Sequence, residues 1–145
     1  MLLTFHSLAG AAIASQVPNP LISWPLALVS HFVLDCLPHW DFFTGGIKTT
    51  RKVQLAILLD FSIGLLAGLS AAFLYPQNAV NILGACFFAC LPDGFSFLWM
   101  LHGPGNRFLD LQISLQKRLH FKSPLPWGMV VPSLTAVGSL YFLLR

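Results

Sequence analysis

Apolar residues fill most of the chain in long runs, and polar residues interrupt them at only a few places. Five apolar segments stand out, at residues 2–17, 21–38, 53–75, 79–101 and 127–144. A helix needs about 20 apolar residues to span a bilayer, so the first segment is short. Proline-containing turns at 18–20 and 76–78 separate the segments of two pairs, because proline cannot continue a helix. The pattern predicts an all-α integral membrane bundle of four to five spans.

The segment 106–121 has a different pattern. One helical face carries its large apolar residues: Phe108, Leu111, Leu115 and Leu119. Its charged residues lie mostly on the other faces, which is typical of an amphipathic helix in the membrane interface. Residues 109–116 also alternate between apolar and polar, so a strand stays an alternative. A lone strand would leave its edges unpaired at the membrane, which favours the helix.

Composition and charge support a membrane protein. Hydrophobic residues make up 56% of the chain, charged residues 9%, and the mean hydropathy is +0.74, whereas soluble domains carry about 25% charged residues. A net charge of +3 is too small to indicate nucleic-acid binding. The basic residues gather in two loops, one with Lys48, Arg51 and Lys52, the other with Arg107, Lys117, Arg118 and Lys122. The positive-inside rule makes both loops cytoplasmic, and we expect contact with membrane lipids.

Ionisable residues are concentrated at 30–41, in the run S-H-F-V-L-D-C-L-P-H-W-D. His31, Asp35 and His39 are four apart, so in a helix they share one face. An ionisable group near the bilayer centre costs about 2.5 kcal/mol or more by insertion scales, and such groups usually have a function. Asp41 follows the helix end, where it is either a further member of the site or a solvated residue.

Further polar residues lie in the same half of the predicted membrane, and imidazole with carboxylate is a ligand set for Zn²⁺ or Mn²⁺. We expect one or two ions. The predicted metal ligands are His6, His31, Asp35, His39 and Asp93. Asp60, as ligand or general base, and Asp41 are the catalytic candidates. A hydrogen-bonded polar core without metal is the alternative. His102 and His120 are interpreted as interfacial side chains.

The chain also contains a weak internal repeat. A shift of 54 residues places His6 on Asp60 and the Leu-Pro-His of 37–39 on the Leu-Pro-Asp of 91–93. This predicts two parallel helix pairs, 2–43 and 56–97, with a site between them. Together with the interfacial segment 106–121 and the final span 127–144 they would form a single domain, 1–145.

Several function classes lack support in the sequence. A Gly-rich nucleotide motif and a Gly-x-Ser-x-Gly nucleophile motif are both missing. The three cysteines lie in apolar stretches and are interpreted as buried apolar side chains. The remaining chemistry is hydrolysis by metal-activated water. The alternative is a non-enzymatic membrane protein with a polar or metal-binding core, serving ion or proton passage, structure or partner binding.

At these residues the chain resembles the small bacterial and archaeal membrane-bound metal-dependent hydrolases. The matching pieces are F-H-S-L-A-G-A-A-I-A-S at 5–15, N-P-L-I-S-W-P-L-A-L-V-S-H-F-V-L-D-C-L-P-H-W-D at 19–41 and L-P-D-G at 91–94. The resemblance implies a multi-pass protein of the prokaryotic inner membrane that hydrolyses a lipid-like or phosphoester substrate. The family's later His-Arg-x-x-Thr-His motif is absent, and that region contains His102 and His120 instead.

Overall fold

The computed structural model describes residues 1–42 and 51–145, and this part of the chain is helical without β-strands. Lys48 of the first predicted basic loop lies outside the described residues. The helices are α1 (Leu3–Gln16), α2 (Pro20–Asp35), α3 (Arg51–Leu74), η1 (Pro76–Asn78), α4 (Ala79–His102), α5 (Arg107–Leu119), η2 (Trp127–Met129) and α6 (Val130–Leu144). The predicted all-α class is confirmed, and the strand alternative at 109–116 is wrong.

Local sequence explains where these helices begin and end. The Asn19 side chain accepts a hydrogen bond from Leu21 N–H, and Pro20 occupies the first turn of α2, a position that suits proline. Asn106 caps α5 in the same way by accepting from the N–H of Phe108. Gly103 ends α4 with a positive φ of 74°, which glycine adopts without steric cost.

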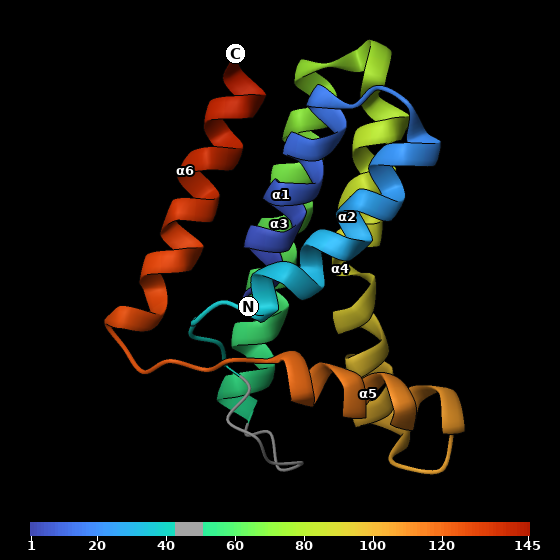
Figure 1. Cartoon of the computed structure of the whole chain (residues 1–145), viewed down its shortest axis with the longest axis vertical. Helices are drawn as coiled ribbons and strands as arrows, with labels where there is room; N and C mark the ends of the chain where they lie inside the picture. The colour runs from blue at the N-terminus through green and yellow to red at the C-terminus, as the bar shows by residue number, and fades with distance from the viewer. Residues whose placement is uncertain (43–50) are drawn as a thin grey trace.

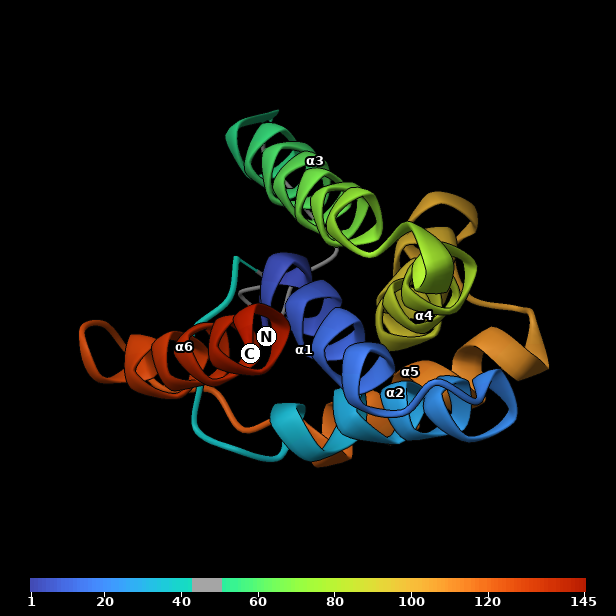
Figure 2. The same cartoon turned by 90° about the horizontal axis from the view of Figure 1, so that it is seen from above.

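Helix α1 forms the centre of the molecule. It packs against α2, α3, α4 and α6, and Figure 2 shows it surrounded by them. Figure 1 shows α3, α4 and α6 running along the long axis, with α5 lying across one end. Side chains of α1 that face these four helices are therefore buried.

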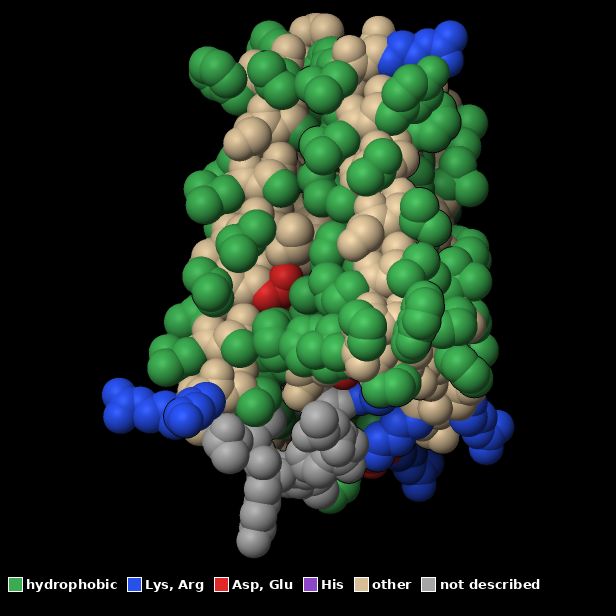
Figure 3. Space-filling model, turned by 90° about the vertical axis from the view of Figure 1, so that its left-hand side faces the viewer, with side chains coloured by type: hydrophobic (Ala, Val, Ile, Leu, Met, Phe, Trp, Pro, Cys, Tyr) green, Lys and Arg blue, Asp and Glu red, His purple; other side chains and the backbone are tan. Residues whose placement is uncertain are grey.

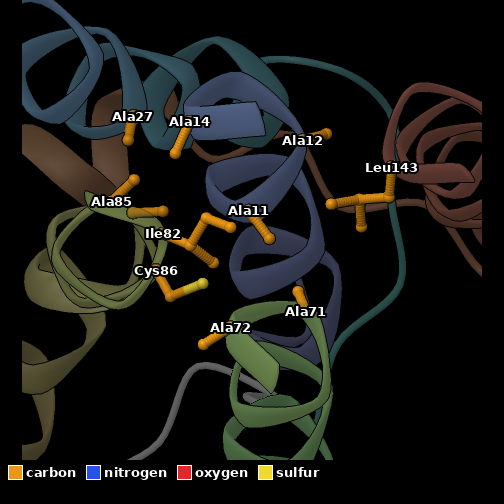
Figure 4. Packing of buried hydrophobic residues seen from close by; sticks show 11 residues of the cluster. Ala11, Ala12, Ala14, Ala27, Ala71, Ala72, Ile82, Ala85, Cys86 and Leu143 are labelled. Atoms are coloured by element: carbon orange, nitrogen blue, oxygen red, sulfur yellow. The ribbon is translucent and has the colours of Figure 1, made fainter. Parts of the chain in front are cut away.

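Small residues make the helix contacts. The core cluster consists mostly of alanines, together with Ile82, Cys86 and Leu143 (Figure 4). A Cβ added to Gly10 would lie 2.7 Å from the carbonyl oxygen of Ala85, so α1 and α4 approach almost backbone to backbone. Small residues at close helix contacts are typical of membrane bundles, where packing rather than water exclusion drives association.

The large apolar side chains point outward. Leu21, Phe73 and Val80 are 83%, 86% and 78% exposed, and Figure 3 shows apolar side chains covering one face, with Lys and Arg mainly at one end. Exposed apolar surface on this scale marks contact with a membrane or with other proteins. The inside of the bundle is thus built of smaller and more polar residues than its outside.

Three helical stretches are long and apolar enough to cross a membrane: Arg51–Leu74, Pro76–His102 and Trp127–Leu144. Helix α2 is apolar but has only 16 residues, and α1 has 14. At 1.5 Å per residue, α1 is about 21 Å long, against a hydrocarbon core of about 30 Å. Three of the five predicted spans thus have the required length, and the other two stay predictions.

Helix α5 is amphipathic with its apolar face outward. Phe108, Leu111 and Leu115 are 59%, 70% and 46% exposed, whereas Gln116 is buried. In a water-soluble protein the apolar face would point to the core. The predicted amphipathic helix is therefore present, and its polar side faces the bundle.

The predicted repeat relates helices of unequal length. Helix α1 has 14 residues and its predicted equivalent α3 has 24; α2 has 16 and α4 has 24. The two-fold arrangement of helix pairs stays a prediction.

Candidate metal centre

One group of possible metal ligands joins three helices. His6 of α1, His31 of α2 and Asp93 of α4 each direct one ligand atom to a common region, where these atoms lie within 4.8 Å of one another. Both histidines are fully buried, and the Asp93 side chain is 20% exposed. Three residues that the sequence separates by up to 87 positions thus come together in the structure.

A second group lies where α2 ends. Asp35, His39 and His120 also offer ligand atoms within 4.8 Å of one another. The segment after α5 is attached to the segment after α2 by backbone hydrogen bonds: Phe121 N–H donates to the Asp35 carbonyl (3.0 Å), and His39 N–H to the Phe121 carbonyl (3.1 Å). These bonds bring His120 to the site.

Asp35 connects the two groups, because four imidazoles surround its buried carboxylate. Its Oδ1 lies 3.2 Å from His6 Nε2 and 3.8 Å from His39 Nε2. Its Oδ2 lies 3.3 Å from His31 Nε2 and 3.3 Å from His120 Nδ1. The Met1 amino group is 2.5 Å from Oδ1. A carboxylate shared in this way can bridge two adjacent cation sites.

Backbone carbonyls set the orientation of two of these imidazoles. His31 Nδ1 lies 2.8 Å from the Ala89 carbonyl oxygen, and His39 Nδ1 lies 2.8 Å from that of Leu37. A carbonyl only accepts, so each Nδ1 carries the hydrogen and each neutral ring has its lone pair on Nε2. Both Nε2 atoms face the Asp35 carboxylate. This is the usual arrangement of metal-binding histidines, whose other nitrogen donates to a carbonyl or carboxylate.

His6 has polar atoms that the protein does not satisfy. Both of its ring nitrogens and Asp35 Oδ2 are buried without a hydrogen bond in the described chain. His6 Nε2 is close to Asp35 Oδ1 but lacks hydrogen-bond geometry. An unsatisfied buried polar group costs about 1–3 kcal/mol. A divalent cation would satisfy the lone-pair nitrogen of His6 and Asp35 Oδ2 together, so the residues fit a metal.

Asp41 contacts the second group from its outer side. Its Oδ2 accepts from His120 Nε2 (2.5 Å), and its Oδ1 accepts from Lys122 Nζ (3.0 Å). Burial alone would raise the pKa of Asp41, but hydrogen bonds from His120, His39 and Lys122 lower it overall. Burial would lower the pKa of His120, but bonds to Asp35 and Asp41 raise it overall. Asp41 is thus an ionised partner that orients His120.

Asp60, the other predicted catalytic residue, lies outside both groups. From α3 it accepts hydrogen bonds at the start of α1: from Leu3 N–H (2.7 Å), Thr4 N–H (3.2 Å) and Thr4 Oγ1 (2.6 Å). An acceptor at a helix N-terminus satisfies N–H groups that have no partner within the helix. Asp60, on a neighbouring helix, therefore caps α1 at Leu3 and Thr4. His6 follows two residues after Thr4.

The sequence interpretation missed His120. No histidine or acid lies at metal-ligand spacing from His120 in the sequence, so the sequence places it at the membrane interface together with His102. In the structure His102 is exposed and bonded to the Leu98 carbonyl. A usable signal existed, since Gln112, Gln116 and His120 are four apart. This polar row has the same spacing as His31, Asp35 and His39, and the structure places the two rows against each other.

Comparison with known proteins gives no relative for this site. No protein-family description, curated protein or solved structure matches the chain. The family resemblance of the sequence motifs stays a prediction.

Proposed function

We propose that the chain is a membrane-embedded metal-dependent hydrolase that acts on a lipid-like or phosphoester substrate through metal-activated water. One observation carries the proposal: four imidazoles from separate parts of the chain converge on one buried carboxylate, that of Asp35. The Met1 ammonium contacts Asp35 Oδ1, and a divalent cation would satisfy Oδ2 and a lone pair of His6, which have no hydrogen-bond partner in the described chain.

The two groups have the composition of divalent metal sites. His6, His31 and Asp93 would hold one ion, and Asp35, His39 and His120 a second, with Asp35 able to bridge them. Zn²⁺ suits these nitrogen and oxygen ligands, and Mn²⁺ is the second choice. Catalytic zinc sites have three protein ligands and an open position for water, whose pKa the metal lowers to about 7. Asp41, through His120, would orient one ligand.

The surroundings of the site favour a substrate from the membrane. Large apolar side chains cover the outside of the bundle, and α5 presents Phe108, Leu111 and Leu115 outward beside the site. Basic residues gather at the same end. By the positive-inside rule this end is cytoplasmic in an inner-membrane protein. Helices α3, α4 and α6 would be the spans, the shorter α1 would lie between them, and α2 would pack against α1 and α4.

Ion passage is the less favoured alternative. A path would need free polar groups toward the other end of the bundle. There the Ser23 hydroxyl donates to Asn81 Oδ1 (2.6 Å), and Asn81 Nδ2 donates to the Val17 carbonyl (3.0 Å). These groups are occupied in holding α2 and α4 to the end of α1.

The first test is the metal content of the full-length protein, purified in detergent micelles without chelator. We expect one or two Zn²⁺ or Mn²⁺ per chain, and their loss in Asp35→Ala and in the similar-sized Asp35→Asn. His102→Ala is the matched control, because this exposed histidine lies outside both groups. Wild-type protein without stoichiometric metal would overturn the proposal.

The second test is activity. Metal-loaded protein in micelles that contain phosphatidic acid should release inorganic phosphate, and a chelator should stop the release until Zn²⁺ is restored. Metal binding without hydrolysis of this or other phosphoester and carboxylic ester lipids would leave a metal-binding protein and exclude the hydrolase.

A further inference from the structure

Gln116 is a buried amide on a helix whose neighbouring apolar residues are exposed. It lies on the inward face of α5 and is 7% exposed, whereas Leu115 beside it is 46% exposed. Burying an amide costs free energy unless its oxygen and nitrogen find partners. The partners of Gln116 therefore indicate its role.

The amide oxygen has two donors. Ser96 Oγ on α4 donates to Gln116 Oε1, and so does Gln112 Nε2, at 3.0 Å. Gln112 is itself held by a bond from its Nε2 to the Pro92 carbonyl (2.9 Å). An amide oxygen only accepts and an amide nitrogen only donates. The two donors thus fix which way the side chain is turned, with its nitrogen toward the metal centre.

The amide nitrogen meets two of the three members of the first ligand group. Nε2 donates to Asp93 Oδ1 at 2.8 Å and lies 3.4 Å from His31 Nε2. Asp93 is the most exposed member of its group, with 20% of its side chain accessible. Without the bond from Gln116 its carboxylate could turn away from the two histidines.

We propose that Gln116 is a positioning residue of the metal centre. By donating to Asp93 Oδ1, which lies 3.8 Å from His31 Nε2, it holds the Asp93 carboxylate beside the ligand nitrogen of His31. This inference rests on the proposed metal site. It assigns to α5, which supplies no ligand of the first group, the task of orienting one.

Other contacts hold α5 independently of Gln116, so removing the amide should leave the helix in place. Trp99 Nε1 donates to Asp110 Oδ1 (2.7 Å), and the N–H of Gly105 donates to Asp110 Oδ2 (3.1 Å). Backbone bonds from Phe121 to Asp35 attach the segment after it. The effect of a Gln116 variant can therefore be read at the metal centre.

The experiment measures Zn²⁺ affinity by chelator competition, and the Co²⁺ absorption spectrum, on full-length protein in micelles. Gln116→Ala removes the amide, and Gln116→Glu keeps its size and oxygen but replaces the donor with an acceptor. We expect about 10- to 100-fold weaker Zn²⁺ binding in Gln116→Ala, the usual effect of losing a residue that orients a ligand, and a changed Co²⁺ spectrum in both variants. Ser114→Ala, an exposed change on the same helix, should match wild type.

The outcomes separate this inference from the proposed function. If wild type binds no metal, the proposed function and the role of Gln116 are both wrong. If wild type binds metal and both Gln116 variants keep its affinity and spectrum, only the inference falls. A variant that loses thermal stability but keeps affinity and spectrum also overturns it, because a packing role alone would then explain Gln116.

Discussion

Two buried polar regions at opposite ends of α1 differ in how their polar atoms are satisfied. Near the end of α1, Asn81 bonds to Ser23 and to the Val17 carbonyl, and no buried side-chain atom of Ser23 or Asn81 lacks a partner. Near its beginning, His6 and Asp35 retain buried atoms without hydrogen bonds in the described chain. The first region is complete as protein alone, whereas the second has polar atoms that a bound cation could satisfy.

This contrast separates a structural polar core from a ligand site. Buried polar groups in folded proteins nearly always find partners, so unsatisfied ones need an explanation. In a membrane bundle the requirement is stricter, because no water is available in the hydrocarbon region. The buried atoms of His6 and Asp35 that lack partners therefore argue for a bound ion more strongly than the mere presence of histidines and acids does.

The largest expected effect is the response of stability to metal. With free Zn²⁺ at about 1,000 times its Kd, binding should stabilise the folded state by about 4 kcal/mol. Thermal unfolding in micelles, with Zn²⁺ and with chelator, measures this shift. Asp35→Asn should abolish it, and Asn81→Ala should retain it. Equal responses of the two variants would remove the distinction between the regions.

An intermediate effect is expected at the complete region. Asn81→Ala leaves the Val17 carbonyl and the Ser23 hydroxyl without their partner, which should destabilise the protein by about 1–3 kcal/mol with unchanged metal content. Gln77→Ala, an exposed change in the nearby turn, is the control and should have little effect. Loss of metal in Asn81→Ala would show that the two regions are coupled.

The smallest expected effect concerns Asp60, at the beginning of α1. Asp60→Ala removes the cap of α1 and should cost about 0.5–2 kcal/mol. Zn²⁺ affinity should fall as well, because His6 lies on the first turns of α1, and Thr4→Val should show a weaker form of both effects. Asp60→Asn with normal stability and metal affinity but no hydrolysis would instead make Asp60 a catalytic residue, as its sequence context predicts.

The helices and much of the site were predictable because both depend on short spacings. Uninterrupted apolar runs and proline-bounded turns predict helix boundaries within a few residues of those observed, as at α4, expected at 79–101 and found at Ala79–His102. The four-residue spacing of His31, Asp35 and His39 predicts their shared face. His6 and Asp93 stood out because a lone ionisable residue in an apolar run is costly.

The parts that were missed depend on contacts between distant segments. The role of Asp60 follows from its place against the first turn of α1, 56 and 57 positions away. His120 is brought in by backbone bonds between the segments after α2 and α5. The inward side of α5 is polar and its outward side apolar, which reverses the rule for soluble proteins and is the pattern expected of a helix at a membrane surface.

By itself the sequence determined an all-α, apolar chain with a buried set of histidines and acids, because hydropathy and helical period act over short distances. Only the tertiary structure decided which of these residues share a site, which one caps a helix, and that Asp35 lies at the centre of four imidazoles. Those relations depend on close backbone approach at small residues such as Gly10, and on the path of the chain between helices, which local patterns do not encode.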